Sequence, residues 1–244
     1  MPKREGYRFE GWYKDEELKE RYTFNVTPVT ESFTLFAKWR ANEPVRAYIN
    51  GFPDGTFKPD AAVTREQMAL MVANILTNYN VPKTSGNAPF TDTAHSYAKE
   101  AIHYVNSIGL MTGKTASAFD PQGKMTRAEM ATVVARYEQK RCENTPSENC
   151  MTKPTVIHFF DVVENHWAKP SIQYVAQMDV MRGYEDGSFK PENNITRAET
   201  VKVLNQLFNR KALPSGVIAK QFVDTNGHWA RTEIEKAATT YTSY

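Results

Sequence analysis

Three arginines stand directly after a threonine, each at the start of an amphipathic run: Arg65, Arg127 and Arg197. A glutamate or glutamine follows each threonine by three positions, which is the capping box that begins a helix. A cation in the first helical turn opposes the helix dipole, at a cost of about 0.3–1 kcal/mol at an exposed site. Because this unfavourable placement recurs, we expect another use, since free helix amides plus a guanidinium make a small anion site.

The same arginines could instead pair with carboxylates of the protein, and the sequence leaves both uses open. The acids in question would be Asp92, Asp161 and Asp224. A bidentate contact from arginine to a carboxylate contributes about 1.5–3 kcal/mol, enough to select a charged sugar over a neutral one.

Aromatic residues recur before the first helix of each repeat. Trp167 and Trp229, with Tyr97 at their place in another copy, could offer a flat face to a sugar ring or simply pack the helix start.

Asp-Gly pairs recur in the loops, as Asp54-Gly55 and Asp186-Gly187. We expect both glycines to permit a turn with positive φ, while the aspartates either brace that turn or bind a ligand hydroxyl. The loop aromatics are predicted to plug the core, and they are Phe57, Phe119 and Phe189.

Metal and cofactor sites are not expected. Setting Asp186-Gly187 at positions 5 and 6 of a calcium loop puts Arg182 at position 1 and Asn193 at position 12, where such a loop requires Asp and Glu. The two cysteines, Cys142 and Cys150, lie in a polar segment and could form a disulfide or remain free thiols.

The arginines belong to an internal repeat, in which a glycine precedes the threonine by 13 positions in every copy: Gly51 and Thr64, Gly113 and Thr126, Gly183 and Thr196. A Phe-x-Asp element followed by a histidine also recurs, and it opens a further amphipathic helix. Each unit therefore reads helix, glycine-containing loop, helix.

The first unit lacks its leading helix and the chain ends on a lone one near residues 229–238. We therefore predict a mainly α fold in which three units form a pseudo-threefold bundle. The C-terminal helix would complete the first unit by packing against residues 68–76. The expected units are about 44–80 with 220–244, 88–140 and 156–212, with a small N-terminal β segment before them.

Composition limits the class of partner. The 244 residues are 41% hydrophobic and 24% charged, with a formal net charge of +2, which is an ordinary globular composition. That charge gives no broad field for nucleic acid, and no apolar stretch is long enough for a membrane span. Met1 to Glu20 is too charged and aromatic for a signal peptide, so an export signal would lie upstream.

The three repeats resemble the S-layer homology domain, over about residues 44–244. That resemblance implies a three-pronged pseudo-trimer whose inter-repeat grooves bind secondary cell wall polymer, often carrying pyruvylated N-acetylmannosamine. It also implies that Arg65, Arg127 and Arg197 contact the acidic ketal. Trp167, Trp229 and the Asp-Gly pairs are secondary candidates. The middle copy departs from the family, because residues 114–118 replace the Asp-Gly turn.

Residues 1–40 form a different kind of sequence. Phe33, Leu35, Ala37 and Trp39 alternate as they would along a strand. This segment looks like the internalin-type or Listeria-Bacteroides repeat, a small β-grasp-like module of surface proteins, without its usual opening strand.

The expected function is therefore non-catalytic anchoring of an exported bacterial surface protein to an anionic wall polysaccharide. One alternative is a purely structural or protein-interaction module, in which the arginines tie the repeats together. A cell-wall hydrolase using His103 or His158 is disfavoured, because no nucleophile and base recur with a defined spacing.

Overall fold

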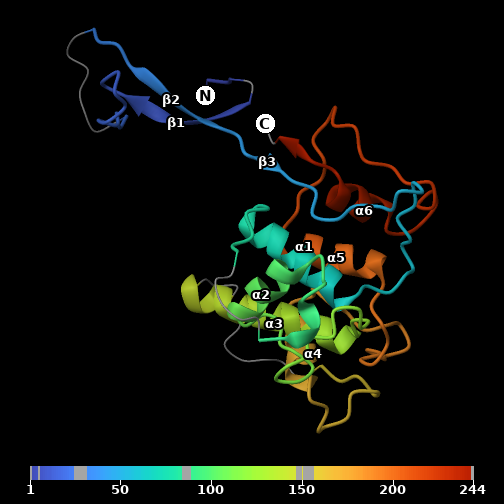
Figure 1. Cartoon of the computed structure of the whole chain (residues 1–244). Coiled ribbons are helices and arrows are strands. Elements are labelled where there is room, and N and C mark those ends of the chain that lie inside the picture. Colours follow the sequence, from blue (N-terminus) through green and yellow to red (C-terminus); the bar gives the residue numbers. More distant parts are fainter. Residues whose placement is uncertain are drawn as a thin grey trace. The chain divides into compact units, whose positions relative to one another are not determined.

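The computed structural model describes residues 2–4, 6–24, 32–83, 89–146, 150 and 157–242. The chain divides into two compact units. One unit comprises residues 1–47, 212–218 and 239–244, and the other comprises residues 48–211 and 219–238. The second unit holds all the helices that position the candidate site (Figure 1).

The first unit contains two small antiparallel sheets. Strand β1 (Tyr7–Tyr13) pairs with β2 (Phe36–Ala41), and β3 (Pro44–Val45) pairs with β4 (Tyr241–Thr242). The predicted N-terminal β segment is confirmed, although its second strand begins at Phe36, so that Phe33 and Leu35 lie outside it. Phe9 packs edge-on against Trp39 across the sheet, with ring centroids 5.4 Å apart.

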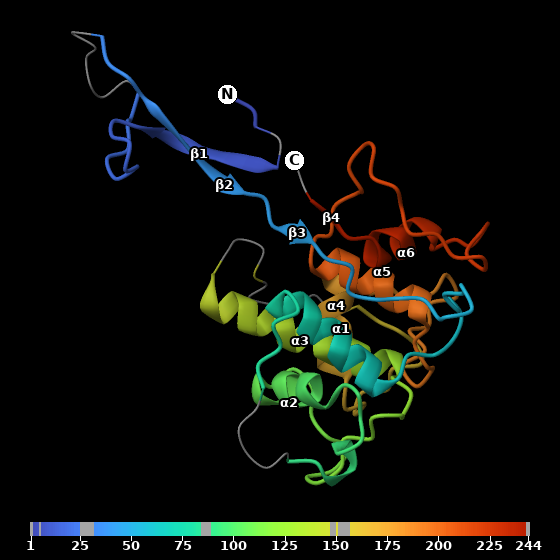
Figure 2. The same cartoon turned by 45° about the horizontal axis from the view of Figure 1, so that its top comes forward.

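Six α-helices and one short 3-10 helix form the second unit (Figure 2). The α-helices pack in three pairs, α1 with α2, α3 with α4 and α5 with α6. The mainly helical prediction is confirmed. Their bounds are α1 Arg65–Thr77, α2 Lys99–Ser107, α3 Arg127–Asn144, α4 Lys169–Gln177, α5 Arg197–Leu207 and α6 Arg231–Ala238, with the 3-10 turn at Thr91–Thr93.

The predicted capping boxes begin α1, α3 and α5. In each, the threonine hydroxyl accepts the amide three positions on, and the side chain at that position accepts the threonine amide. Orphan amides at the helix start are thereby satisfied.

The C-terminal helix departs from the prediction. Helix α6 packs against α5, so the expected packing on residues 68–76 of α1 is wrong. The segment before α6 reaches the first copy through its loop instead. Phe222 packs on Phe57 with centroids 5.2 Å apart, and the Asp224 carboxylate accepts the Phe57 and Lys58 amides at 2.8 and 2.7 Å. A loop contact thus replaces the expected helix contact.

The other two copies make the same loop contact. Phe90 packs on Phe119 and Phe159 packs on Phe189, with centroids 5.4 and 5.3 Å apart. Asp92 and Asp161 accept the two amides that begin at each loop phenylalanine. The loop phenylalanines are fully buried, which confirms that they plug the core.

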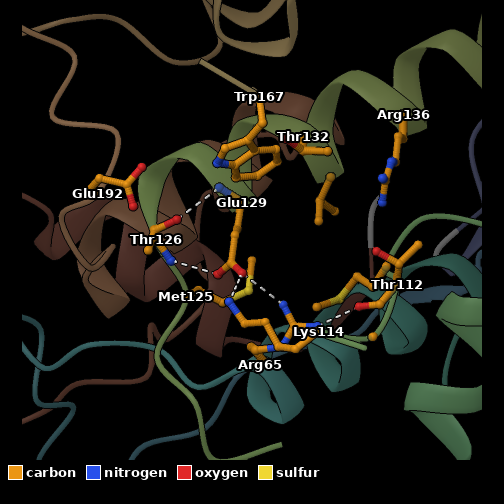
Figure 3. A pocket seen from close by; sticks show the side chains of 13 residues that line it. Arg65, Thr112, Lys114, Met125, Thr126, Glu129, Thr132, Arg136, Trp167 and Glu192 are labelled. Carbon is orange, nitrogen blue, oxygen red and sulfur yellow. Dashed lines mark hydrogen bonds and ion pairs between the residues drawn. The ribbon is translucent and has the colours of Figure 1, made fainter. Parts of the chain in front are cut away.

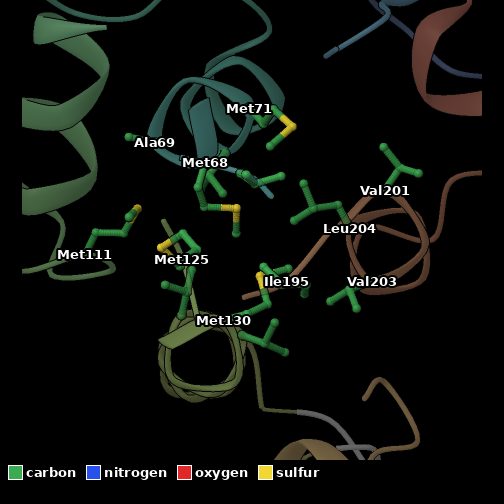
Figure 4. Close-up of a cluster of buried hydrophobic side chains, with 14 of the residues drawn as sticks. Met68, Ala69, Met71, Met111, Met125, Met130, Ile195, Val201, Val203 and Leu204 are labelled. Carbon is green, nitrogen blue, oxygen red and sulfur yellow. The ribbon is translucent and has the colours of Figure 1, made fainter. Parts of the chain in front are cut away.

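A ring of three backbone hydrogen bonds joins the segments that precede α1, α3 and α5. The Val63 amide donates to Ile195 at 3.1 Å, the Met125 amide donates to Val63 at 2.9 Å, and the Ile195 amide donates to Met125 at 2.9 Å. Buried side chains of all three helices, among them Met68, Met130 and Leu204, point toward one another (Figure 4). The starts of the three helices are therefore fixed relative to one another.

The two cysteines form a disulfide, Cys142–Cys150, which ties the end of α3 to the chain that follows. Of the two alternatives that the sequence left open, the structure has the bridge. None of the helices in the described ranges is long and apolar enough to cross a membrane.

Candidate functional site

The three arginines point from one copy into the loop of the next. Each Nε donates to the carbonyl of a core phenylalanine at 2.8 Å: Arg65 to Phe119, Arg127 to Phe189 and Arg197 to Phe57. Each Nη2 donates to the carbonyl just before the loop glycine, at 2.6 Å to Thr112, 3.1 Å to Arg182 and 2.8 Å to Asn50. The arginines therefore bind the copies to one another in a cycle.

The remaining nitrogen, Nη1, distinguishes the three arginines. In Arg65 it lies 3.2 Å from Glu129, and in Arg127 it lies 3.2 Å from Glu199. In Arg197 it has no hydrogen-bond or ion-pair partner within the described part of the chain. Two of the arginines thus carry an internal counter-ion and the third does not.

The expectation of unburied guanidinium groups is wrong, because only 4% of Arg65, 6% of Arg127 and 5% of Arg197 is exposed. The alternative of pairing with the protein's own acids is correct for Arg65 and Arg127, but the acids differ from those expected. Asp92, Asp161 and Asp224 accept backbone amides.

The helix amides are not free either. The Arg65, Arg127 and Arg197 amides each donate at 2.9 Å to a loop carbonyl of the next copy, those of Gly123, Asn193 and Ala61. The following amide in each helix donates to a second carbonyl of that loop. An anion site made of amides plus guanidinium is therefore absent at these three helix starts, since the fold consumes the amides.

Burial changes the acidity of two of the arginines. It lowers the pKa of Arg65, and the nearby Glu129 carboxylate partly offsets this effect. It lowers the pKa of Arg197 to about 10. Arg197 still carries its charge at neutral pH, in a desolvated place where Asp224 and Tyr97 offset only part of the effect of burial.

A groove of about 340 Å³ opens beside Arg65 (Figure 3). We call it the Arg65 groove. Lys114 and Arg65 both reach Glu129 on one side, and Trp167 stands on the other. Arg136 lines the same groove and donates to the Leu110 carbonyl at 3.3 Å, so it meets no carboxylate among the described residues.

A corresponding groove of about 530 Å³ opens beside Arg127. We call it the Arg127 groove. Tyr184 donates its hydroxyl to Glu199 at 3.0 Å, at the position that Lys114 holds in the other groove. Trp229 lines the opposite side, and the Lys202 ammonium lies 5.5 Å from the centre of its ring. Both grooves therefore combine a buried arginine, a glutamate, a further cation and an indole.

Two family models match parts of this chain. The S-layer homology domain model matches residues 46–69, 89–131 and 159–201. The chain carries three S-layer homology segments. The Listeria-Bacteroides repeat domain model matches residues 1–38, so both resemblances seen in the sequence are confirmed.

Several curated proteins are similar to this chain over most of its length. Cell surface glycoprotein 1 of Acetivibrio thermocellus is 34% identical over 199 residues, which are 79% of this chain and 8% of that protein. The Cellulosome-anchoring protein of the same organism is 30% identical, over 81% of this chain and 43% of that protein. An Endoglucanase of Bacillus sp. is 29% identical, over 73% of this chain and 19% of that protein.

The chain spans less than half the length of these relatives. The family match and the surface proteins among the relatives place the protein at the bacterial cell surface, as predicted.

The aromatic residues that precede α2, α4 and α6 are presented outward. Trp167 is 60% exposed, Trp229 is 59% exposed and Tyr97 is 65% exposed, so packing of the helix start does not explain them. In two segments the preceding histidine fixes the local chain. The Nδ1 atoms of His166 and His228 each accept, at 3.1 Å, the amide of the alanine after the tryptophan.

The Asp-Gly pairs of the S-layer homology segments lie apart from the two grooves. Gly55 and Gly187 have φ of 80° and 81°, which confirms the predicted turn. Asp54 accepts the Thr56 amide and hydroxyl, and Asp186 accepts those of Ser188, so both aspartates brace the turn.

Sequence reasoning missed Lys114, Arg136, Lys202 and Tyr184 as groove residues. A signal for two of them was present, because Lys114 and Tyr184 both follow the loop glycine of the repeat. That glycine is itself structural. A Cβ on Gly113 or Gly183 would come within 2.5 or 2.3 Å of a phenylalanine ring.

Proposed function

We propose that this chain is a non-catalytic module that anchors a bacterial surface protein to the cell wall by binding an anionic, pyruvylated polysaccharide between its repeats. The observation that carries the proposal is the paired construction of the Arg65 and Arg127 grooves. Each combines an exposed indole with cations, which suits a ring that has both an apolar face and a negative charge.

The fold behind this proposal is a closed pseudo-threefold bundle, in which the segment before α6 closes on the loop of the first copy through Phe222 and Asp224. The backbone ring at Val63, Met125 and Ile195 supports it, because each copy donates to another. The arginines support it independently, since Arg197 returns to the loop of the first copy across 140 positions of sequence. The inter-repeat grooves are a consequence of this closure.

Within the two grooves, the cations that form no ion pair with a carboxylate of the described residues are the ones available to a ligand. Arg136 is such a cation in the Arg65 groove and Lys202 in the Arg127 groove. Trp167 and Trp229 would stack on a sugar ring opposite these cations. The buried Arg65 and Arg127 add a positive electrostatic potential to the grooves. Their ion pairs with Glu129 and Glu199 reduce that potential.

The internal contacts of Arg65 and Arg127 favour a second function for the same module. Their bonds to neighbouring copies fit a structural or protein-interaction role, in which the arginines only hold the repeats together. The exposed tryptophans favour ligand binding instead, because an indole left in water gives no stability to the fold.

Catalysis in this chain is not part of the proposal. Lining residues of the two grooves include neither His103 nor His158. The printed name of one relative is Endoglucanase, and this chain covers 19% of it, so an enzyme could stand in another part of a longer protein.

The test is binding to purified Gram-positive walls, before and after acid extraction of the wall polymer. We expect wild-type protein to bind native walls and to lose binding on extracted walls. The Trp167→Ala, Trp229→Ala double variant should bind at least about tenfold more weakly, since a buried Trp anchor is worth about 2 kcal/mol. Phe160→Ala is the matched control, because Phe160 is an exposed aromatic outside both grooves. Equal binding to extracted walls would refute the proposal.

A further inference from the structure

The three arginine positions share most of their contacts. Arg65, Arg127 and Arg197 share the Nε and Nη2 hydrogen bonds to carbonyls of the next loop, and all three guanidinium groups lie over a buried phenylalanine ring. Arg127 and Arg197 also lie near a second ring, Tyr184 and Phe52. The difference in charge is at Nη1, because Arg197 has no ion-pair counterpart to Glu129 and Glu199 among the described residues.

A single residue accounts for this difference. The third position of the capping box is Glu129 or Glu199 in two copies and Gln67 in the first. Glu129 uses one carboxylate oxygen to accept the Thr126 amide and turns the other to Arg65. Gln67 uses its only side-chain oxygen to accept the Thr64 amide at 3.1 Å. Its remaining atom, Nε2, is a donor.

Two donors cannot satisfy each other. In the other two copies, a carboxylate oxygen at this position of the capping box faces Nη1 of an arginine. In the first copy the equivalent atom is Nε2 of Gln67, and the equivalent arginine is Arg197. Neither nitrogen has a hydrogen-bond partner within the described ranges. An incoming carboxylate would accept from both at once, whereas at Arg65 and Arg127 it would have to compete with a glutamate already in place.

We infer that Gln67 makes the Arg197 position the preferred acceptor of the ligand's carboxylate, and that Glu129 and Glu199 weaken the other two positions by occupying their arginines. This inference rests on the proposed function and names the residue that ranks its binding positions. Tyr97 is exposed and accompanies Arg197 as the indoles accompany the other arginines. Burial and the Glu66 carboxylate raise the pKa of Tyr97, and the nearby Arg197 guanidinium opposes that rise.

The lowered pKa of Arg197 agrees with the inference. Burial lowers it to about 10, and the nearby Tyr97 and Asp224 side chains offset that effect only in part. A bound carboxylate would stabilise the buried charge of Arg197. Part of the free-energy cost of burying that charge would therefore be recovered on binding.

The test is the Gln67→Glu variant, which supplies the missing counter-ion and preserves the capping box that the other copies already have. The probe is the methyl glycoside of pyruvylated N-acetylmannosamine, with the same glycoside lacking the ketal as reference, measured by titration calorimetry on the full chain. We expect Gln67→Glu to weaken binding of the ketal by about tenfold to a hundredfold. Gln139→Glu, which adds the same charge at an exposed place on α3, should leave it unchanged.

The reciprocal variant, Glu199→Gln, should release Arg127 and add a second ketal-dependent site to the titration. It keeps the inference testable if Gln67→Glu does not fold. Unchanged affinity in Gln67→Glu and no added site in Glu199→Gln, with wild-type protein binding the ketal, would overturn the inference and leave wall anchoring intact. Wild-type protein that binds walls but not the ketal would overturn the ligand class. Wild-type protein that does not bind walls would overturn the proposed function itself.

Discussion

The Arg65 and Arg127 grooves are built alike but lined differently. Both have an arginine bonded to the same two kinds of carbonyl and to one glutamate. The residue after the loop glycine is Lys114 in one groove and Tyr184 in the other, and both reach that glutamate. The Arg65 groove therefore has two cations on its glutamate, and the Arg127 groove has one cation and a hydroxyl.

The loop of the middle copy shows which parts of the repeat the fold requires. It lacks the Asp-Gly turn, yet Asp92 still accepts the Phe119 and Asp120 amides. Asp120 has φ of 62°, close to the 56° and 55° of Lys58 and Lys190 at the same place in the other copies. The loop is therefore held by the carboxylate and the arginine, and the turn can vary without moving the groove.

The largest expected effect is on stability, and it differs between Arg127 and Arg65. Arg127→Met should lower the free energy of unfolding by about 3–5 kcal/mol, because it leaves Glu199 and two loop carbonyls without their cation. Arg65→Met should cost less, since Lys114 still pairs with Glu129. Urea unfolding of both variants measures the difference. Equal losses would show that Lys114 does not support the Arg65 groove.

Exchanging the residues after the loop glycine should affect ligand binding more than stability. Lys114→Tyr removes a cation from the Arg65 groove and gives it the lining of the other. We therefore expect wall binding that is several-fold weaker and less sensitive to salt, because less charge is left for salt to screen. Tyr184→Lys is the reciprocal variant and should bind more tightly at low salt. Binding isotherms at two salt concentrations test this pair, and effects in the opposite directions would show that the lining cations do not meet the ligand.

Separate Trp167→Ala and Trp229→Ala variants should distinguish the grooves by function. Both side chains are largely exposed, so melting temperature should change little. The variant with the larger loss of wall binding identifies the groove that carries more of the ligand. If neither variant binds more weakly, the indoles do not contact the polysaccharide.

The smallest expected effect concerns the Asp-Gly turns, which only the outer copies have. Hydrogen bonds from Thr56 and Ser188 lower the pKa values of Asp54 and Asp186. The folded state then binds fewer protons than the unfolded state, so their contribution is present above the ordinary pKa and is lost as the pH falls through the lowered one. The Asp54→Asn, Asp186→Asn variant should therefore show a shallower loss of stability between about pH 5 and 2. Thermal unfolding across that range measures it, and an unchanged slope would contradict the assignment.

Much of the fold could be predicted because its signals are local. The capping boxes, the helices after them and the buried loop phenylalanines each depend on residues a few positions apart. The partner of α6 could not be predicted in this way. Several amphipathic helices of similar length compete for similar faces, and the choice of α5 follows from how the complete chain closes.

The positions of the arginines and tryptophans, and the pattern that three copies share, can be read from the sequence alone. The hydrogen-bond partners of each arginine cannot, because they lie in the next copy, 54 positions away for Arg65 and 140 for Arg197. Helix amides that a sequence presents as free are consumed by the same contacts. The physical reason is that a buried guanidinium must satisfy its donors, and the packing of neighbouring copies determines which acceptors come within reach.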